Sequence, residues 1–252
     1  NKNGELVTPK DTVFKSKNEL GDAYGMKKSS SIGKEWYEQA AAFASYVQGK
    51  TLEEVKAIKV DEQNYLTGAD IKSSVTISVG GFLEAIEKAV GSAQDAPEGL
   101  SESDLLRVGL VSDMSSSASA ADGKDGAGAL NVTVAAVARN TGGVITGCVI
   151  DSVSSSVTFS KSGAITSDLS MEVKSKNELG ESYGLKKSSS LGKEWNEQAK
   201  AFAEYVTGKT LSEVQGIAVS EGGAPQSEDL KSSVTIRVGD FIKAIERAIA
   251  VG

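Results

Sequence analysis

The chain has 252 residues, 39% of them hydrophobic, and a formal net charge of -7 at pH 7. This acidic balance argues against nucleic acid as a partner, because phosphates attract a basic surface, and no run approaches the roughly 20 apolar residues of a membrane-spanning helix. The chain has no histidine, so Ser-His-Asp and Cys-His catalysis and imidazole metal sites are excluded.

Repetition organises the chain. Shifted by 159 positions, residues 1–93 align without a gap with residues 160–252, and 51 of the 93 pairs are identical. Identical blocks recur at 15–21 and 174–180 (KSKNELG), 33–36 and 192–195 (GKEW), and 72–77 and 231–236 (KSSVTI). Shared composition does not produce so many identities, so we expect two copies of one fold.

The two copies are unequal in length. A unit of 159 residues makes the second copy complete and the first only the last part of another unit, because nothing ahead of Asn1 matches residues 105–159. Either the first copy is truncated upstream or its strands come from elsewhere. We therefore expect a partial N-terminal copy at 1–93, a linker at 94–104 and a complete module at 105–252.

The first copy shows helical spacing from Trp36. Apolar side chains recur every three or four positions at Trp36, Ala40, Phe43, Tyr46 and Val47. Gly49 then stands where a helix C-cap would. We expect these aromatic rings in the core, with a wall that stacks on a cofactor ring as the alternative. The pattern returns at Trp195, Ala199, Phe202, Tyr205, Val206 and Gly208.

The carboxylates near the start of these two helices raise the question of catalysis. Glu35 and Glu38 lie three positions apart, as do Glu194 and Glu197. We expect each pair to share one solvated helix face, and a general acid/base pair is the alternative.

Two further helices are expected in each copy. Thr51 with Glu54, and Thr210 with Glu213, match a capping box, which starts a helix by satisfying free N–H groups of the first turn. The last helix begins near Gly80 or Gly239. Its apolar face contains Phe82, Ile86, Ala89 and Val90 in the first copy, and Phe241, Ile245, Ala248 and Ile249 in the second. The core is expected to include Trp36, Phe43, Val47, Val55, Phe82 and Ile86 with Trp195, Phe202, Val206, Val214, Phe241 and Ile245.

A cluster of hydroxyl groups precedes the last helix of each copy. Because Val75, Ile77 and Val79 alternate, a short strand is the favoured interpretation. The alternative is an anion site, since hydroxyls and free N–H groups at a helix start can both donate to a phosphate. A ligand site, if there is one, is expected at Ser232, Ser233 and Thr235, with its remnant at Ser73, Ser74 and Thr76.

The complete copy opens with strand patterns. Residues 106–112 have the pattern of a strand, and the small and polar residues that follow, up to 128, predict a loop. Residues 130–137 and 144–151 predict a hairpin that is closed by the turn Asn-Thr-Gly-Gly. A second hairpin is expected over residues 157–165. Strands followed by helices predict an α+β domain with an antiparallel sheet packed by helices.

Two features of the strand region bear on chemistry. Cys148, the single cysteine, lies in an apolar run and is expected to pack as a small hydrophobic residue, with a reactive thiol as the alternative. Residues 122–126 (DGKDG) carry oxygen ligands but lack the spacing and the final glutamate of a calcium loop. No metal site is therefore expected.

The order of motifs resembles bacterial FMN-binding domains of cell-envelope lipoproteins and electron-transfer subunits. SSVT at 73–76 and 232–235 is similar to that family's Ser-Gly-Ala-Thr motif, and AIEKA and AIERA, at 85–89 and 244–248, to its following helix. The motif's threonine can carry FMN through a phosphoester bond. Here serine replaces the glycine and valine the alanine, adding bulk where backbone approaches phosphate. The resemblance therefore implies weak, non-covalent FMN binding.

Two functions follow as hypotheses. The first is an electron relay of the bacterial cell surface that binds FMN, meets a redox or surface protein partner, and reaches the membrane only through a lipid anchor upstream of Asn1. The second is a cofactor-free surface binding or scaffolding module whose repeats act through multivalency. Neither hypothesis makes the chain itself an enzyme.

Overall fold

The chain divides into two compact units. The computed structural model describes residues 1–93, 97 and 99–250. One unit is Lys15–Asp95, here called the helical unit, and the other is Asn1–Phe14 together with Ala96–Gly252, here called the sheet unit. The division falls inside the expected linker at 94–104, of which residues 94–96 and 98 lie outside the described residues.

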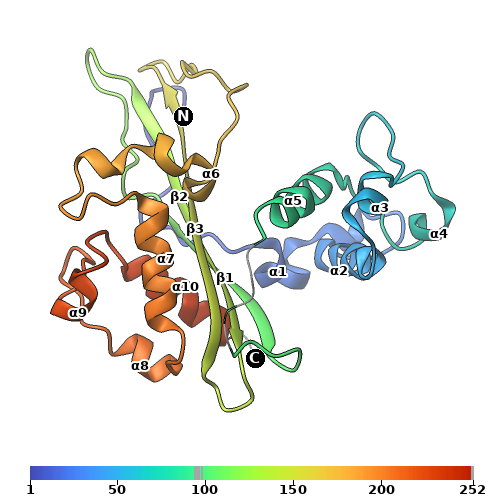
Figure 1. The fold of residues 1–252 in the computed structure, drawn as a ribbon. Helices are drawn as coiled ribbons and strands as arrows, with labels where there is room; N and C mark the ends of the chain where they lie inside the picture. Colours follow the sequence, from blue (N-terminus) through green and yellow to red (C-terminus); the bar gives the residue numbers. More distant parts are fainter. Residues whose placement is uncertain (94–96, 98, 251–252) are drawn as a thin grey trace. The chain divides into compact units, whose positions relative to one another are not determined.

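A three-stranded antiparallel sheet in the order β1-β2-β3 is the frame of the sheet unit (Figure 1). The strands are β1 (Leu105–Asp113), β2 (Gly126–Arg139) and β3 (Ile145–Phe159). The predicted strands are confirmed, and each is longer than expected. The expected hairpin over 157–165 is smaller, because its first part belongs to β3 and only a single bridge joins Phe159 to Ile165.

The turn between β2 and β3 forms where the sequence predicts it. The backbone carbonyl of Asn140 accepts from the N–H of Gly143 at 3.0 Å, and its side-chain Oδ1 accepts from Val144 at 3.0 Å. Gly143 has a φ of +80°, a conformation that glycine adopts without a Cβ penalty. The turn chemistry therefore sets the register of the hairpin.

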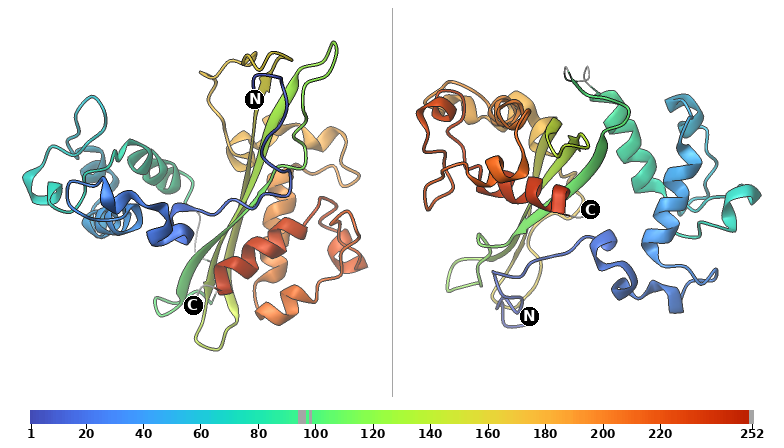
Figure 2. Two further views of the ribbon diagram at one scale, coloured as in Figure 1. Left: turned by 180° about the vertical axis from the view of Figure 1, so that it is seen from behind. Right: turned by 90° about the horizontal axis from the view of Figure 1, so that it is seen from below.

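Two helices of equal length cover one face of this sheet (Figures 1 and 2). α7 (Trp195–Val206) packs on β3, and α10 (Gly239–Ala250) packs on β1 and β2. The approach is close at Gly109, where an added Cβ would clash with the backbone of α10. The predicted core of the second copy is confirmed, because all six residues are buried: Trp195, Phe202, Val206, Val214, Phe241 and Ile245.

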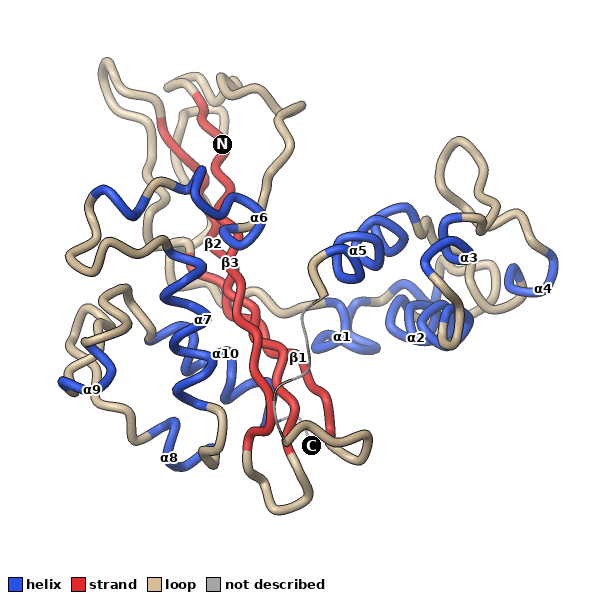
Figure 3. The backbone as a smooth tube through the Cα atoms, in the orientation of Figure 1, coloured by secondary structure: helices blue, strands red, loops and turns tan. Residues whose placement is uncertain are grey.

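The remaining helices are short, and the same order of elements occurs in both units (Figure 3). The sheet unit contains α6 (Lys176–Leu179), η3 (Gly180–Tyr183), η4 (Leu185–Lys187), α8 (Leu211–Gln215) and α9 (Glu228–Lys231). The helical unit contains α1 (Lys17–Leu20), η1 (Gly21–Tyr24), η2 (Met26–Lys28), α2 (Trp36–Val47), α3 (Leu52–Lys56), α4 (Ala69–Lys72) and α5 (Gly80–Gly91). None of the helices in the described part of the chain is long and apolar enough to cross a membrane.

Capping boxes start several of these helices. The predicted boxes at Thr51 and Thr210 are confirmed, since each hydroxyl accepts from the N–H three residues later and each glutamate accepts in return. The same reciprocal bonds at Ser16 and Ser175 start α1 and α6. These two helices were not predicted, although the S-x-x-E spacing within KSKNELG is the pattern that a capping box requires.

The expectation that Glu35 and Glu194 are solvated is wrong. Glu35 is 2% exposed, and its carboxylate accepts from the backbone N–H groups of Met26 and Lys27 at 2.8 and 2.9 Å. Glu194 makes the equivalent pair of bonds in the sheet unit. These carboxylates are buried because they satisfy free N–H groups of the preceding turn.

The strand expected over Val75, Ile77 and Val79 is also absent. α4 ends at Lys72, and no strand is assigned over the seven following residues, up to Val79. The N–H of Thr76 finds its acceptor in the side chain of Gln39 at 2.7 Å, so no neighbouring strand is needed. The alternation of apolar residues instead reflects the burial of Val75 and Val79 beneath α2 and α5.

The core of the helical unit is smaller than expected. Phe43 and Val55 are buried as predicted. The other four predicted residues are only half-buried: Trp36, Val47, Phe82 and Ile86. Among the described residues of this unit there is no strand beyond a single bridge from Val60 to Leu66, so no sheet covers the two long helices.

The first fourteen residues belong to the sheet unit. The N–H of Ala120 donates to the carbonyl of Gly4 at 2.7 Å, and Ser119 Oγ accepts from Leu6 at 3.0 Å. Phe14 donates its N–H to Ser112 Oγ on β1 at 3.0 Å. This grouping differs from the expected partial copy at 1–93, because these contacts join the segment to β1 and to the loop after it.

Candidate functional site

The hydroxyls that sequence reasoning selected lie after α9 and α4. Ser232 Oγ donates to the carbonyl of Asp229 at 2.7 Å, and Ser233 Oγ donates to that of Leu230 at 3.3 Å. Both acceptors are carbonyls of α9, and that of Leu230 also accepts from the N–H groups of Ser233 and Val234, at 3.1 and 2.8 Å. These two serine side chains therefore bond back onto the end of a short helix.

Thr235 is held by a buried glutamine of α7. Gln198 Oε1 accepts from the N–H of Thr235 at 2.8 Å, from its hydroxyl at 3.2 Å and from the N–H of Ile236 at 3.3 Å. Gln198 is fully buried, and its Nε2 donates to Ser189 Oγ and the carbonyl of Lys193. All four hydrogen-bonding positions of the amide are thereby used.

The helical unit repeats this arrangement. Gln39 Oε1 accepts from the N–H of Thr76 at 2.7 Å and from its hydroxyl at 3.2 Å. Sequence reasoning did not identify Gln39 or Gln198. The sequence pattern that could have identified them is a glutamine that recurs unchanged inside the apolar stripe of both helices. A buried amide at such a position requires a complete set of hydrogen-bond partners.

This arrangement does not form a ready phosphate site. The hydroxyls of Ser232, Ser233 and Thr235 already donate to protein acceptors. Val234 lies among them and is fully buried in the core. A phosphate would have to break these hydrogen bonds, so the residue set fits FMN poorly.

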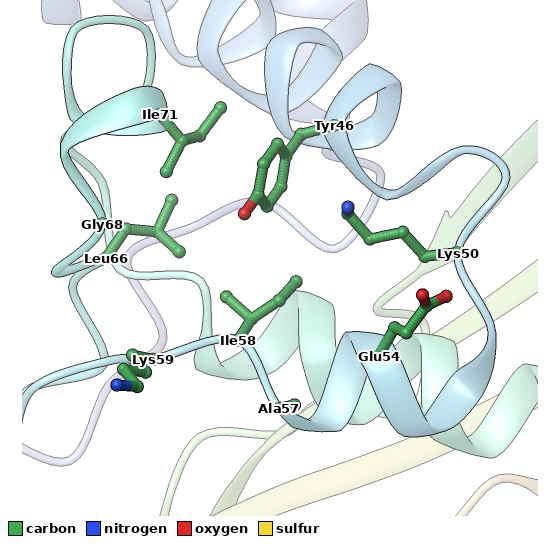
Figure 4. Close-up of a pocket in the computed structure, with 9 residues that line it drawn as sticks. All are labelled: Tyr46, Lys50, Glu54, Ala57, Ile58, Lys59, Leu66, Gly68 and Ile71. Carbon is green, nitrogen blue, oxygen red and sulfur yellow. The ribbon is translucent and has the colours of Figure 1, made fainter.

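A pocket that sequence reasoning missed occurs in both units. In the helical unit it has a volume of about 250 Å³ (Figure 4), and in the sheet unit about 270 Å³. The two pockets share most of their lining, at positions 159 apart: Tyr46 and Tyr205, Lys50 and Lys209, Glu54 and Glu213, Ala57 and Gly216, Ile58 and Ile217, Lys59 and Ala218, and Gly68 and Ser227.

Three elements place the side chains of the helical-unit pocket. Tyr46 comes from the last turn of α2, Lys50 from the turn that follows, and Glu54 from the first turn of α3. The Lys50 ammonium lies 4.7 Å from the centre of the Tyr46 ring, and Lys209 lies 4.3 Å from that of Tyr205. This cation–π contact holds a positive charge beside an aromatic face at the rim.

The carboxylate of each pocket is ionised at neutral pH. The backbone N–H of Thr51, and then its hydroxyl, lower the pKa of Glu54, and Thr210 lowers the pKa of Glu213 in the same order. Because both carboxylates are tied into capping boxes, their positions are set by the start of α3 and α8.

The two pockets differ in part of their lining. Lys59 stands in the helical unit where the sheet unit has Ala218, and its side chain points away from Tyr46 and Lys50 (Figure 4). Leu66 and Ile71 add apolar floor to the first pocket (Figure 4). Both volumes lie below the roughly 300 Å³ at which drug-sized ligand sites begin. Each pocket therefore suits a single side chain or a similarly small group.

The other reactive groups among the described residues do not gather into one site. Burial raises the pKa of Cys148 to about 12, and the side chain packs against the core as expected. Across the residues that the structure describes, no group of three or more Cys, Asp or Glu side chains is placed to hold a metal ion. Asp122, from the DGKDG segment, instead forms an ion pair with Lys161.

Comparison with known proteins gives one short similarity. A stretch of 43 residues, 17% of the chain, is 51% identical to a protein named chlorophenol reductase from Desulfitobacterium hafniense, of which it covers 13%. No protein-family profile matches the chain, and no solved structure matches it. A likeness of this extent does not place the chain in a family.

Proposed function

We propose that the chain is a non-enzymatic binding module that offers the same small pocket twice. The observation that carries this proposal is the recurrence of Tyr, Lys and Glu, with the same cation–π contact, in both units. The recurring order of elements, from α1 to α5 and from α6 to α10, supports a partial copy over residues 15–93 and a complete module over residues 105–252. Two linked sites act together through effective concentration even where each is weak.

The lining defines the ligand class. Ile58 and the Tyr46 ring offer apolar contact to one side chain. Lys50 offers a cation to an acidic group beside it, whereas the ionised Glu54, held in the capping box by Thr51, repels that group and weakens its binding. An apolar or aromatic side chain next to a carboxylate, as in the C-terminal residue of a peptide, meets both requirements.

N-acetylphenylalanine is a suitable probe, because it joins a ring to a free carboxylate. Titration into the full chain, followed by NMR of methyl and ring signals, should shift those of Tyr46, Ile58, Tyr205 and Ile217 together. Tyr46→Ala should abolish the shifts in the helical unit and leave those in the sheet unit unchanged. Tyr205→Ala should abolish the shifts in the sheet unit and leave those in the helical unit unchanged.

The amide of the same probe controls for the carboxylate. N-acetylphenylalaninamide lacks the negative charge and should bind more weakly to both pockets, because it cannot pair with Lys50 or Lys209. If N-acetylphenylalanine shifts no signal of either pocket at concentrations that saturate weak sites, the proposal is wrong.

A flavin-carrying electron relay at the bacterial cell surface is the second candidate. It is supported by the FMN-domain resemblance and by a local likeness to a protein whose name is that of a reductase. The visible absorption of the purified chain, before and after incubation with FMN, tests it. Flavin bands that stay with the protein through gel filtration, and are lost in Thr235→Ala, would favour this candidate.

A further inference from the structure

One face of the helical unit is bare. Ala44, Ala85 and Ala89 are exposed, whereas the equivalent alanines of α7 and α10 are buried. Val90, at the end of α5, is 50% exposed. We call this surface the α2–α5 face, and it comprises Trp36, Ala40, Ala44, Val47, Phe82, Leu83, Ala85, Ile86 and Ala89.

The sheet unit shows what covers the equivalent face. The counterparts on α7 and α10 are all buried, in one cluster with Val111, Ala135 and Ile150 of the sheet. Every residue of the α2–α5 face is identical to its counterpart except Leu83, which is Ile242. Positions that point away are free to differ, as at Ala41 and Lys200, Ser45 and Glu204, and Glu84 and Lys243.

The fit between helix and strand is specific. A Cβ added at Gly109 of β1 would lie within 3 Å of backbone atoms of Ala244 and Ala248. Ala85 and Ala89 place the same small side chains on α5. Arg247 donates to the carbonyl of Leu110 at 2.6 Å, and Lys88 keeps a cation at the equivalent position of α5. The α2–α5 face thus repeats the contact surface of α7 and α10 in shape and in charge.

We propose that the α2–α5 face binds a three-stranded antiparallel sheet of the β1–β3 type, supplied by another copy of the module. The partner sheet carries a glycine in its edge strand, where Ala85 and Ala89 require close approach, and alternating apolar residues that cover Phe82 and Ile86. Its binding completes for the helical unit the core that the sheet unit already has.

The sheet of a second molecule of this chain is not the occupant. α7 and α10 already cover the inner face of β1–β3. A sheet that moved onto the α2–α5 face of a partner molecule would leave its own α7 and α10 bare. Because the two helical faces are nearly identical, this exchange buries no additional apolar surface and does not drive association.

A chain extended by its own sheet tests the proposal. Residues 94–159 are joined ahead of Asn1, which restores the 159-residue spacing of the repeat. In a Trp195→Phe background, Trp36 is the single tryptophan and reports on the α2–α5 face. The expected result is a blue shift of Trp36 emission to the value of Trp195, which is 5% exposed, and amide exchange in α5 slowed by roughly tenfold or more.

Two variants of the extended chain act from opposite sides of the contact. Leucine in place of the added copy of Gly109 blocks the approach of the strand, and Ala89→Glu places a charge on the exposed helix. Both should abolish the blue shift and the protection. Ala89→Glu should leave the melting of the unextended chain unchanged, which separates loss of docking from loss of folding.

Two results would overturn the proposal. One is an extended chain in which neither Trp36 emission nor α5 exchange changes. The other is a dimer of the unextended chain in sedimentation velocity that Ala89→Glu dissociates, since the occupant would then be a second copy of this chain.

Discussion

Gln198 on α7 and Thr235, just before α10, are joined by a hydrogen bond of 2.8 Å from the threonine N–H to the glutamine Oε1. Gln39 and Thr76 make the equivalent bond at 2.7 Å in the helical unit. Both glutamines are fully buried. In each unit one side chain thus replaces the neighbouring strand that the segment before the last helix would otherwise require.

Gln198→Leu should destabilise the sheet unit by about 1–3 kcal/mol, because it leaves the N–H groups of Thr235 and Ile236 without an acceptor. Urea denaturation followed by Trp195 fluorescence in a Trp36→Phe background measures the change. Gln215→Leu, at an exposed position of α8, is the matched control and should change stability by less than about 0.5 kcal/mol. Equal stability of the two variants would contradict the role assigned to Gln198.

Ile245→Ala and Ile86→Ala form a matched pair on α10 and α5. Ile245 is fully buried under the sheet, so its truncation should cost about 2–5 kcal/mol. Ile86 is half-buried, and its truncation should cost markedly less, because a half-exposed side chain leaves a smaller cavity. The two single-tryptophan backgrounds report each unit separately in thermal or urea unfolding. Similar losses for both would show that the two faces are equally covered.

The capping box of α8 makes a pH prediction. The N–H and hydroxyl of Thr210 lower the pKa of Glu213 below its ordinary value. A folded-state pKa below the unfolded value stabilises the fold above the unfolded pKa, and the contribution is lost as the pH falls through the folded pKa. α8 should therefore loosen in acid, below about pH 4.5.

Carboxyl-detected NMR titration of Glu213 measures this pKa directly. Thr210→Ala removes the hydroxyl and should raise the pKa of Glu213 toward its ordinary value. Thr51→Ala should do the same for Glu54, whose pKa is lowered by the same two groups of Thr51. An unchanged pKa in both variants would mean that the hydroxyls do not contribute.

Cys148 should be unreactive in the folded chain. Burial raises its pKa to about 12, so the thiolate that attacks disulfide reagents is scarce at pH 8. Reaction with an aromatic disulfide reagent should be slower by a factor of about 100 or more than in denaturant. A rate in the folded protein equal to that of a free thiol would show that the strand region opens readily.

Local chemistry was sufficient for much of the fold. Thr51 and Thr210 started helices as predicted, because a capping box needs only residues three positions apart. Asn140 and Gly143 placed the turn of the hairpin, because their preferences act within four residues. The repeat itself was readable without a structure, since an offset of 159 needs only identity.

Groups whose partners lie far along the chain were not readable in this way. Glu35 is buried by N–H groups eight and nine residues before it, and Thr76 is held by Gln39, 37 residues away. The pockets at Tyr46 and Tyr205 depend on three elements that converge only after folding. No local pattern distinguishes such residues from ordinary core or surface positions.

Trp36 and Trp195 show most directly what the sequence alone could not predict. The two residues start equivalent helices after the same residues GKE, and they contact equivalent phenylalanines at the same ring separation of 5.6 Å. Yet Trp195 is buried and Trp36 only half-buried. The sequence by itself determined the helix, its apolar face and the ring pair. Only the tertiary structure decided burial, because burial depends on whether a sheet lies across that face, and β1–β3 cover α7 and α10.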